Sequence, residues 1–547
     1  MTVEHWDAIV VGAGQGGLTC AGYLAASGLR VLVLEQHTVA GGNTQVFRRR
    51  GRYEFDVGTH YLGDCGPDGV LPRIYDGLGL AGRIVFREID PDGFDRIVLP
   101  TVDLRVARGW DAYRDRLTAA LPAEAAGIRE VVDVCAAYHA RQRTALLDPP
   151  TDRNSPMDLR SPPTLGTVMR RAGLSTRARV VFCAQAANYG LGPDQVSVWA
   201  HAAMMGDYLQ GAYYPEGGGQ MLGATLVEAI EGHGGELRTN SLVSAIEVER
   251  NRVVGVRLAS GESVRAPVVV SNADYRRTIL DLVGPAHLPP ATVARAARAS
   301  MALPLATLYL AIAEPAMRPL ETNIWWHEHE DVDAVFAELA LGGGAPPRFA
   351  FISSGSAKTG SSVPHHTVEV MTLCPAAFAP GRTGDAAALS HEYRTDGDYR
   401  DAKERLDASL FALAERALGP LAGQVLYREL STPLTHIRFA RSTGGTPYGI
   451  AATPQQFGLL RPAHATPLPG LFLVGASTVS GFGIVGVSVG GVRCAEVITG
   501  QSLLREVYAG KLIGDPARLP DRPPGWDPLS ACRGSRAARH PSRAARR

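Results

Sequence analysis

The chain is poor in cysteine and has no long hydrophobic run. Its seven cysteines are spread over 547 residues, and no two of them form a C-x-x-C pair. Such a scattered, odd-numbered set is typical of buried thiols in a reducing compartment and argues against a disulfide framework. A membrane-spanning helix needs about 18 or more consecutive apolar residues, and no segment supplies them. We therefore expect a cytoplasmic protein without a transmembrane helix.

The chain also lacks a dominant charge. It contains 55 Lys and Arg residues against 54 Asp and Glu residues, and only 7% of its residues are aromatic. No segment interleaves basic with aromatic residues, so we expect no nucleic-acid partner. With 45% hydrophobic and 20% charged residues, the composition is that of an ordinary globular α/β protein. The length allows two or more domains.

The C-terminus departs from this balance. The last twenty residues contain six arginines and no acidic residue, and several prolines precede them. This composition predicts a C-terminal basic tail over residues 506–547 that is disordered from about residue 510. One interpretation is a solvated tail without a partner. The other is a tail that contacts an anionic membrane surface.

What the sequence does contain is a dinucleotide-binding fingerprint near its N-terminus. The stretch "DAIVVGAGQGG" reads as a buried strand followed by Gly12, Gly14 and Gly17, and an alanine-rich helix comes next. Gly12 permits a tight turn, Gly14 lets the backbone approach a pyrophosphate, and Gly17 lets the helix pack on the strand. A second strand, "RVLVLE", ends at Glu35, where a carboxylate can accept hydrogen bonds from the adenosine ribose. This order predicts a Rossmann-type site.

A second glycine motif, "GFGIVG", lies at residues 481–486. In a Rossmann turn the first glycine directly follows the strand, whereas here the strand "LFLV" ends at Gly475, six residues earlier. No buried strand carrying an acid follows the next helix. We therefore interpret the motif as a glycine-rich loop that enters a helix and binds an anion or a ribityl chain. The overlapping G-x-S-x-G match places Ser488 inside that helix, not on the sharp turn that a hydrolase needs.

Two glycine regions that serve one cofactor point to FAD. The pair Gly41 and Gly42, a few residues after Glu35, would let the backbone approach the remainder of a long cofactor. The sequence therefore predicts a single FAD, bound without a covalent link, and no second dinucleotide.

Stretches along most of the chain resemble the FAD-dependent amine-oxidase superfamily, and within it the phytoene desaturase and retinol saturase branch. This resemblance implies an α/β fold, in which a Rossmann-type FAD-binding domain carries an inserted α+β substrate domain. It also implies that Gly475, Gly483 and Ile484 line the flavin and that Val243 contacts the adenine. Asn43 departs from the pattern, because retinol saturases usually carry Cys there and amine oxidases Arg. The resembling stretches are "VVGAGQGGLTCAGYLAASGLRVLVLEQHTVAGG", "EFDVGTHYLG", "AYYPEGGGQML", "VVVSNAD", "STPLT" and "GLFLVGASTVSGFGIVG".

The cofactor motifs fall in three separate blocks of the chain. We predict that residues 1–90, 205–285 and 425–505 assemble into the FAD-binding domain. Residues 91–204 and 286–424 would form the substrate domain, with the substrate tunnel between the two.

The resemblance implies hydride transfer at flavin N5 to or from a carbon–carbon bond of a hydrophobic isoprenoid or polyene, such as a carotenoid or a retinoid. A polyene delocalises developing charge, which is consistent with a sequence that offers no convincing catalytic triad or carboxylate pair. Two alternatives stay open. One is an FAD-dependent oxidase of an amine or a polyketide, and the other is a non-catalytic lipid or prenyl carrier.

Few other residues are candidates for chemistry. His60, in "VGTHYLG", is a weak catalytic candidate because the equivalent loop of the superfamily runs beside the flavin. Tyr213 and Tyr214 could line the tunnel, or could equally belong to a plain core. The stretch "WWHEHE" offers His327 and His329, but their spacing is not that of a known metal motif, and we expect no metal site.

Overall fold

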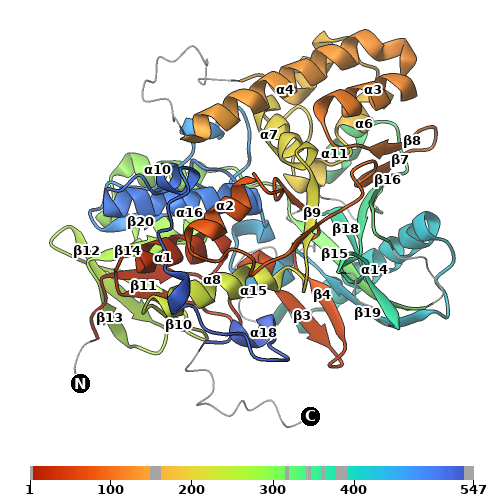
Figure 1. Ribbon diagram of the computed structural model, residues 1–547. Helices are drawn as coiled ribbons and strands as arrows, with labels where there is room; N and C mark the ends of the chain where they lie inside the picture. The colour runs from red at the N-terminus through yellow and green to blue at the C-terminus, as the bar shows by residue number, and fades with distance from the viewer. Residues whose placement is uncertain are drawn as a thin grey trace.

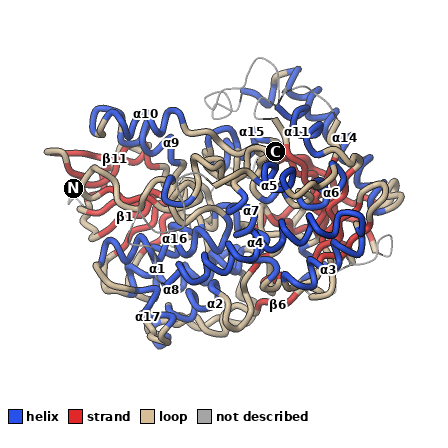
Figure 2. The backbone as a smooth tube through the Cα atoms, turned by 90° about the horizontal axis from the view of Figure 1, so that it is seen from above, coloured by secondary structure: helices blue, strands red, loops and turns tan. Residues whose placement is uncertain are grey.

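The computed structural model describes residues 4–147, 162–314, 320–340, 342, 346–359, 364–375, 378 and 392–534. Two sheets organise the described chain. A five-stranded parallel sheet lies on the left of Figure 1, and a larger mixed sheet lies on the right, with a layer of helices above it. Seen from above in Figure 2, the strands around β1 and the helices around α3 lie at opposite ends of the molecule.

The five-stranded sheet is the dinucleotide-binding sheet that the N-terminal motif predicts. Its order is β10-β2-β1-β14-β20, and every neighbouring pair is parallel. Its strands come from three distant parts of the chain, as the positions of the motifs suggested, although the domain boundaries themselves remain a prediction. The strands are β1 (Ala8–Val11), β2 (Val31–Leu34), β10 (Glu236–Arg238), β14 (Val268–Ser271) and β20 (Leu471–Leu473).

Alternate residues of these strands enter two separate cores, because successive side chains of a strand point to opposite faces. On one face Val10 and Val33 pack against the helices α1 (Gln15–Ala26), α8 (Gln220–Gly232) and α16 (Gly483–Thr499). On the other face Ile9 and Leu32 pack against a three-stranded antiparallel sheet. That sheet consists of β11 (Val243–Glu249), β12 (Arg252–Leu258) and β13 (Ser263–Arg265).

The larger sheet has seven strands in the order β19-β15-β18-β17-β16-β7-β8. Only the pair β16 and β7 is parallel. One face packs against the long helix α14 (Gly397–Leu418), and the other faces the helical layer. The strands are β7 (Asp95–Val98), β8 (Asp103–Val106), β15 (Leu305–Ala313), β16 (Asn323–His327), β17 (Phe349–Ser353), β18 (His365–Leu373) and β19 (Val425–Ser431).

Further helices and small strands complete the described part of the chain. The helical layer contains α3 (Trp110–Ala120), α4 (Ala125–Leu147), α5 (Leu165–Arg171), α6 (Thr176–Phe182), α7 (Val198–Leu209) and α11 (Val332–Ala340). Small strands are β3 (Val46–Arg49) and β4 (Tyr53–Asp56), which form a hairpin, and β5 (Leu62–Gly63), β6 (Phe86–Glu88) and β9 (Ala212–Pro215), which form a sheet. The remaining helices are α2 (Val70–Gly77), α9 (Tyr275–Arg277), α10 (Pro290–Arg298), α12 (Gly355–Lys358), α15 (Pro433–Ala440), α17 (Leu503–Tyr508) and α18 (Pro528–Ala531).

The prediction of a disordered tail is wrong for residues 510–534. This segment crosses the dinucleotide-binding part of the molecule, and Leu529 and Cys532 lie buried in its core. Arg522 makes two hydrogen bonds of 2.9 and 3.0 Å to the carboxylate of Glu228. Composition suggested disorder, but a few buried anchors and well-paired charges are enough to dock an irregular segment. Residues 535–547 lie outside the described residues.

The docked segment reaches the cofactor loop directly. The carbonyl of Cys532 accepts a 2.9 Å hydrogen bond from the amide of Ala40, the residue before the Gly41–Gly42 pair. The carbonyl of Arg533 accepts one of 2.6 Å from the hydroxyl of Thr239. Residues 527–534 thus act as a clamp on this loop, and we call them the C-terminal clamp.

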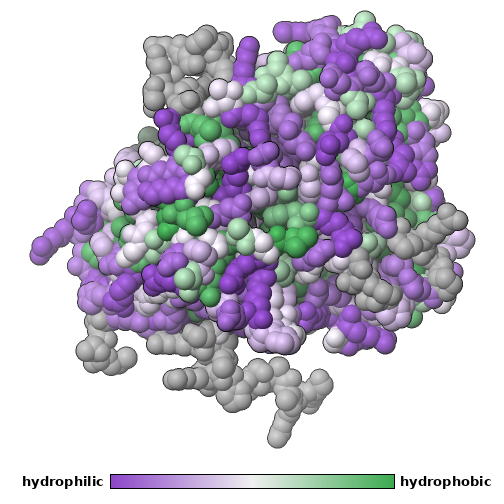
Figure 3. Space-filling view, in the orientation of Figure 1, coloured by the Kyte–Doolittle hydropathy of each residue, from purple (hydrophilic) through white to green (hydrophobic). Residues whose placement is uncertain are grey.

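No helix among the described residues is long and apolar enough to cross a membrane. The face shown in Figure 3 is mainly hydrophilic, and its hydrophobic side chains gather in small, separate groups.

Removing the C-terminal clamp should weaken FAD retention and the fold together. A chain ending at Trp526 loses the burial of Leu529 and two backbone-directed hydrogen bonds, which together stabilise the fold by about 3 kcal/mol. We expect a lower melting temperature and substoichiometric FAD after gel filtration. A chain ending at Gly534 is the matched control, because it retains the clamp and should behave like the full chain. Equal FAD content in both shortened chains would contradict the clamp.

Candidate functional site

One large cavity is lined by residues of both the five-stranded sheet and the seven-stranded sheet. Its volume is about 1530 Å³, whereas pockets for a single small ligand hold roughly 300–1,000 Å³. Its walls come from the carboxyl ends of β1, β2 and β14, from the first turn of α16, and from the inner face of the seven-stranded sheet. The cavity therefore has room for a long cofactor and for a second ligand.

Two glycine loops line the cavity where it meets the five-stranded sheet. The chain at Gly14 pairs with Gly41, and the amide of Gly41 donates a 2.7 Å hydrogen bond to the carbonyl of Ala13. A Cβ atom at Gly42 would stand 2.9 Å from the Cα of Gly14, closer than real Cβ atoms approach. Only glycine fits at these crossings, so the two loops present backbone to whatever lies between them.

Glu35 sits at the end of β2, where the motif predicted it. Its carboxylate accepts hydrogen bonds of 2.8 Å from the amides of Ala13 and His37. Burial raises the pKa of this carboxyl, and the backbone hydrogen bonds act against that rise. Glu35 thus holds the first glycine turn in shape as well as facing the cavity.

Asn272, which the sequence analysis did not single out, fills the gap between the two glycine regions. It follows β14 directly, and its Nδ2 donates to the carbonyl of Gly12 at 3.3 Å. A Cβ at Gly14 would stand 2.8 Å from its Nδ2, and one at Gly475 would stand 2.9 Å from its Oδ1. The signal that could have found it is a polar residue at the carboxyl end of a strand beside β1, within the quoted "VVVSNAD" stretch.

The closing loop follows β20 and leads into α16. Arg461 is buried beneath this loop and donates to the carbonyls of Thr478, at 3.0 Å, and Ala476. Burial lowers the pKa of Arg461 to about 9. Gly483 then begins α16 with φ near +78°, a conformation that favours glycine.

The structure shows whether the second glycine motif belongs to a second dinucleotide-binding unit. After α16, residues 500–534 contain α17, α18 and a short 3-10 turn but no strand. The motif "GFGIVG" is therefore not a second mononucleotide unit, as the sequence analysis predicted. It forms the entrance of a helix that faces the same cavity as the first motif.

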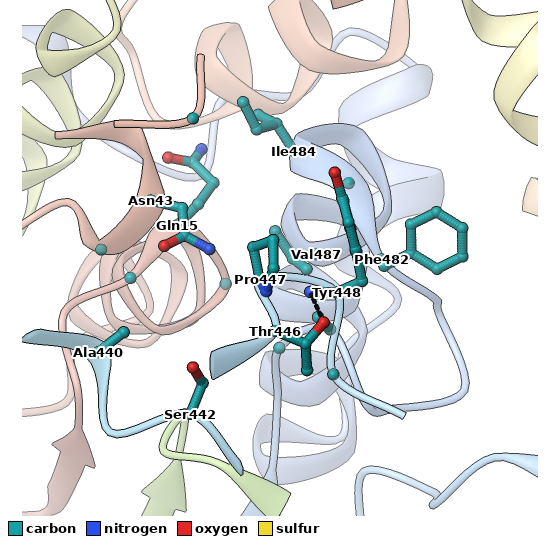
Figure 4. A pocket seen from close by; sticks show the side chains of 18 of the residues that line it. Gln15, Asn43, Ala440, Ser442, Thr446, Pro447, Tyr448, Phe482, Ile484 and Val487 are labelled. Carbon is teal, nitrogen blue, oxygen red and sulfur yellow. Dashed lines mark hydrogen bonds between the residues drawn. The ribbon is translucent and has the colours of Figure 1, made fainter. Parts of the chain in front are cut away.

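The residues at this cavity fit FAD. The N-termini of α1 and α16 both face it, and neither has a side-chain cap or an acidic residue in its first turn. Their free amides and positive dipole ends suit a diphosphate and a flavin. In Figure 4, Gln15 and Asn43 lie on one side of the space, and Pro447 and Tyr448 lie on the other. A long, flat cofactor can lie between these two sides of the cavity.

The structure brings most of the predicted site residues to this cavity. Gly17 does not line it; a Cβ there would stand 2.4 Å from the carbonyl oxygen of Gly12, so Gly17 serves the packing of α1 on β1. The predicted residues that line the cavity are Gly12, Gly14, Glu35, Gly41, Gly42, His60, Val243, Gly475, Gly483 and Ile484.

The expectation that Tyr213 and Tyr214 line the tunnel is not met. Both lie in β9 and neither contributes to the cavity wall. The hydroxyl of Tyr214 donates to the buried carboxylate of Asp56. Tyr213 packs against Gly211 and Gly66 instead. Two adjacent residues of a strand point to opposite faces, and here both faces are covered by protein.

His60 does line the cavity, beside the ring of Phe351 at 5.7 Å. Burial lowers the pKa of its imidazole to about 3, and the nearby Lys358 ammonium adds to the shift. The ring is therefore neutral at physiological pH and is poorly suited to carry a proton.

His327 and His329 face separate partners. His327 Nε2 lies 3.3 Å from the carbonyl of Ala184, and His329 Nε2 lies 2.6 Å from a nitrogen of Arg348. Within the described residues, no group of three or more His, Cys, Asp or Glu side chains could hold a metal ion.

The wall opposite the glycine loops is largely apolar and aromatic. Phe351, Met371 and Leu305 reach it from the seven-stranded sheet, and Tyr208 and Met204 reach it from α7. Such a wall suits a hydrophobic second ligand.

Comparison with known proteins supports FAD as the cofactor. The profile of the family described as flavin containing amine oxidoreductase matches residues 16–499. All-trans-retinol 13,14-reductase from Danio rerio is 25% identical over 542 residues, which cover 92% of this chain and 88% of the relative. Prolycopene isomerase from Daucus carota is 26% identical over 514 residues, which cover 90% of this chain and 80% of the relative.

Solved structures share the fold. An oxidoreductase from Methanosarcina mazei is 16% identical, with a TM-score of 0.58 over 90% of this chain and all of that one. A cyclohexylamine oxidase from Brevibacterium oxydans is 19% identical, with a TM-score of 0.57 over 90% of this chain and 99% of that one. These likenesses confirm the predicted α/β fold class.

Replacing Glu35 with Gln should weaken FAD binding about tenfold or more. The amide side chain cannot accept hydrogen bonds at both ends, so it leaves a backbone amide unpaired and removes a charge-assisted acceptor for the ribose, each worth about 1–3 kcal/mol. FAD titration of the apoprotein by fluorescence quenching measures this. Circular dichroism of the apoprotein controls for folding, and unchanged FAD affinity would place the ribose elsewhere.

Proposed function

The chain belongs to the flavin-containing amine oxidoreductase family, and we propose that it transfers hydride between FAD and a carbon–carbon bond of a hydrophobic isoprenoid or polyene. Family membership confirms the oxidoreductase class and the FAD cofactor that the two glycine regions predicted. The substrate class is the proposed part.

The observation that carries this proposal is the apolar wall of the cavity. The wall lies beyond the glycine loops in one continuous space of about 1530 Å³, so a long hydrophobic chain can lie against a bound flavin. The named activities of the relatives, retinol reduction and prolycopene isomerisation, are consistent with such a ligand. A polyene also explains why the cavity offers no protonated imidazole at His60.

When bound, FAD supplies hydride exchange at its N5 atom. The chain's own residues hold and orient the reactants. The glycine loops and Glu35 would hold the adenosine and diphosphate end, and Asn272 lies between α1 and the closing loop. Tyr448 donates a 2.5 Å hydrogen bond to the carbonyl of Ala187, which joins the wall beside α16 to the helical layer and helps to exclude water.

The direction of hydride transfer can be read from the flavin spectrum under anaerobic conditions. We expect one flavin per chain. Oxidised enzyme should bleach with a desaturation substrate, whereas photoreduced enzyme should regain its colour with a saturation substrate. An isomerase would convert a cis-polyene while remaining reduced. The panel contains carotenoids, retinoids and, as controls, primary amines and a polyketide.

The alternatives give different results in this panel. Bleaching by an amine or the polyketide alone would identify an oxidase of that substrate. A purified chain without a flavin spectrum would indicate a carrier. Either outcome contradicts the proposal.

We further propose that the enzyme collects its substrate at a membrane surface, because a polyene partitions into lipid. Each arginine beyond Gly534 could add attraction of about 1 kcal/mol close to an anionic bilayer. The chain ending at Gly534 should sediment less with anionic liposomes than the full chain, most clearly at low salt. Equal sedimentation of the two would exclude a membrane role for residues 535–547.

A further inference from the structure

A polar spot lies within the apolar part of the cavity wall. Tyr61 and Asn188 both line it, beside Phe351, Met204 and Tyr208. The ring of Tyr61 stacks on that of Tyr208, with centroids 4.1 Å apart and an angle of 7° between the planes. The stacked ring fixes the position of the Tyr61 hydroxyl at the cavity.

A chain of hydrogen bonds holds this spot from behind. The hydroxyl of Tyr61 donates to Asp95 Oδ2 at 3.2 Å. Gln185 Nε2 and Asn323 Nδ2 donate to the same carboxylate at 2.8 and 3.0 Å. Asp95 is completely buried and does not line the cavity. Burial raises its pKa, and these hydrogen bonds oppose the rise.

Lys358 closes the network at its far end. Its Nζ donates to Asn323 Oδ1, to Ser353 Oγ at 2.6 Å and to the carbonyl of His60 at 2.8 Å. Lys358 is buried as well. The side chain of Asn323 links the positive charge of Lys358 to Asp95. The bonds from Lys358 to His60 and Ser353 tie the loop that carries His60 and Tyr61 to the seven-stranded sheet.

A network of this kind is costly for the fold alone. Burying two charged groups with their hydrogen-bonded partners is often no more stabilising than apolar residues of the same volume. It does hold a few polar atoms in one orientation within an apolar pocket, which is how such pockets discriminate between ligands.

The direction of the hydrogen bonds determines what the spot can bind. The hydrogen of Tyr61 is used by Asp95. Asn188 Nδ2 donates to the Tyr61 oxygen at 2.9 Å and contacts Met204 Sδ at 3.9 Å. Turning the Asn188 amide over would set its carbonyl against an oxygen whose hydrogen is already committed, so the network assigns this orientation. Asn188 Oδ1 remains as an acceptor, and the hydroxyl of Tyr208, stacked on Tyr61 at the cavity wall, can donate as well as accept.

We propose that Tyr61 and Asn188 form a subsite that binds a hydroxyl group of the substrate, and that the preferred ligand is a polyene alcohol. A hydroxyl group can donate to Asn188 Oδ1 and accept from the Tyr208 hydroxyl, whereas a carbonyl or a carboxylate can only accept, so the spot favours a hydroxyl. An ammonium group at this spot would need a carboxylate in contact, and the carboxylate behind it, Asp95, is already matched by three donors. Tyr61 and Asn188 are specificity residues, and Asp95 and Lys358 position them.

This subsite rests on the proposed polyene function and is tested by end-group selectivity. All-trans-retinol, all-trans-retinal and all-trans-retinoic acid share one carbon chain and differ only in the end group. Titration of the oxidised holoenzyme, followed by the flavin absorbance, gives a Kd for each. We expect retinol to bind about tenfold tighter than retinal, as one hydrogen bond at a desolvated site allows.

Tyr61→Phe keeps the stacked ring, and Asn188→Leu keeps the side-chain size. Each should bring the ratio of the retinal and retinol Kd values close to one. Tyr138→Phe is the matched control, because Tyr138 also lines the cavity and stacks on Trp199 at 4.8 Å but lies outside the network. It should leave the ratio unchanged. A merely structural role would raise both Kd values together, and FAD content with melting temperature reports on folding.

The outcomes separate the subsite from the function. Equal binding of retinol and retinal by the unaltered enzyme, or a ratio that Tyr61→Phe leaves intact, would overturn the subsite even if polyenes exchange electrons with the flavin. Selective retinol binding without redox exchange or isomerisation of any polyene would overturn the function and support the subsite.

Discussion

The site depends on how closely three backbone segments approach one another. The loops at Gly14, Gly42 and Gly475 come so near to their neighbours that a Cβ atom at any of them would stand within 3.0 Å of another heavy atom. Backbone at this distance leaves its amides free for a cofactor and lets two helix N-termini face one space. In this half of the molecule, Glu35, Asn272 and the C-terminal clamp hold these loops in place through hydrogen bonds to Ala13, Gly12 and Ala40.

Local chemistry made this half predictable from the sequence. A turn that needs glycine, a helix that packs through Gly17 and an acid at a strand end are each encoded within a few residues of one another. The turn between β11 and β12 is equally local, since Arg250 and Asn251 take the left-handed conformation that this tight turn requires. Such features depend on residues close together in the sequence and not on contacts with distant parts of the chain.

What the sequence did not reveal is decided by distant contacts. Asn272 gains its role only when β14 lies beside β1 and the closing loop arrives from 200 residues later along the chain. Tyr61, Asp95 and Lys358 lie far apart in sequence, and each alone reads as an ordinary surface or core residue. The C-terminal segment was misread for the same reason: proline and arginine content describes local preference, whereas the burial of Leu529 and Cys532 depends on the surface they meet.

The two halves of the cavity therefore use different means of recognition. The cofactor half presents backbone, which few substitutions can alter without a clash, so its ligand is fixed by the fold. The substrate half presents side chains from the seven-stranded sheet and the helical layer, where the neighbours of Tyr61 can change without moving the strands. A fold whose solved relatives include an amine oxidase can accept a different substrate by this route, because only the side chains facing the ligand need to differ.

The buried support behind Tyr61 limits that freedom. Removing one member of a buried network of charged and hydrogen-bonded groups leaves the others unpaired, at a cost of about 3–5 kcal/mol for a buried charge. The polar spot is thus the least replaceable part of the substrate wall. Substitutions in the apolar surface around it can adapt the cavity to ligands of different length and shape.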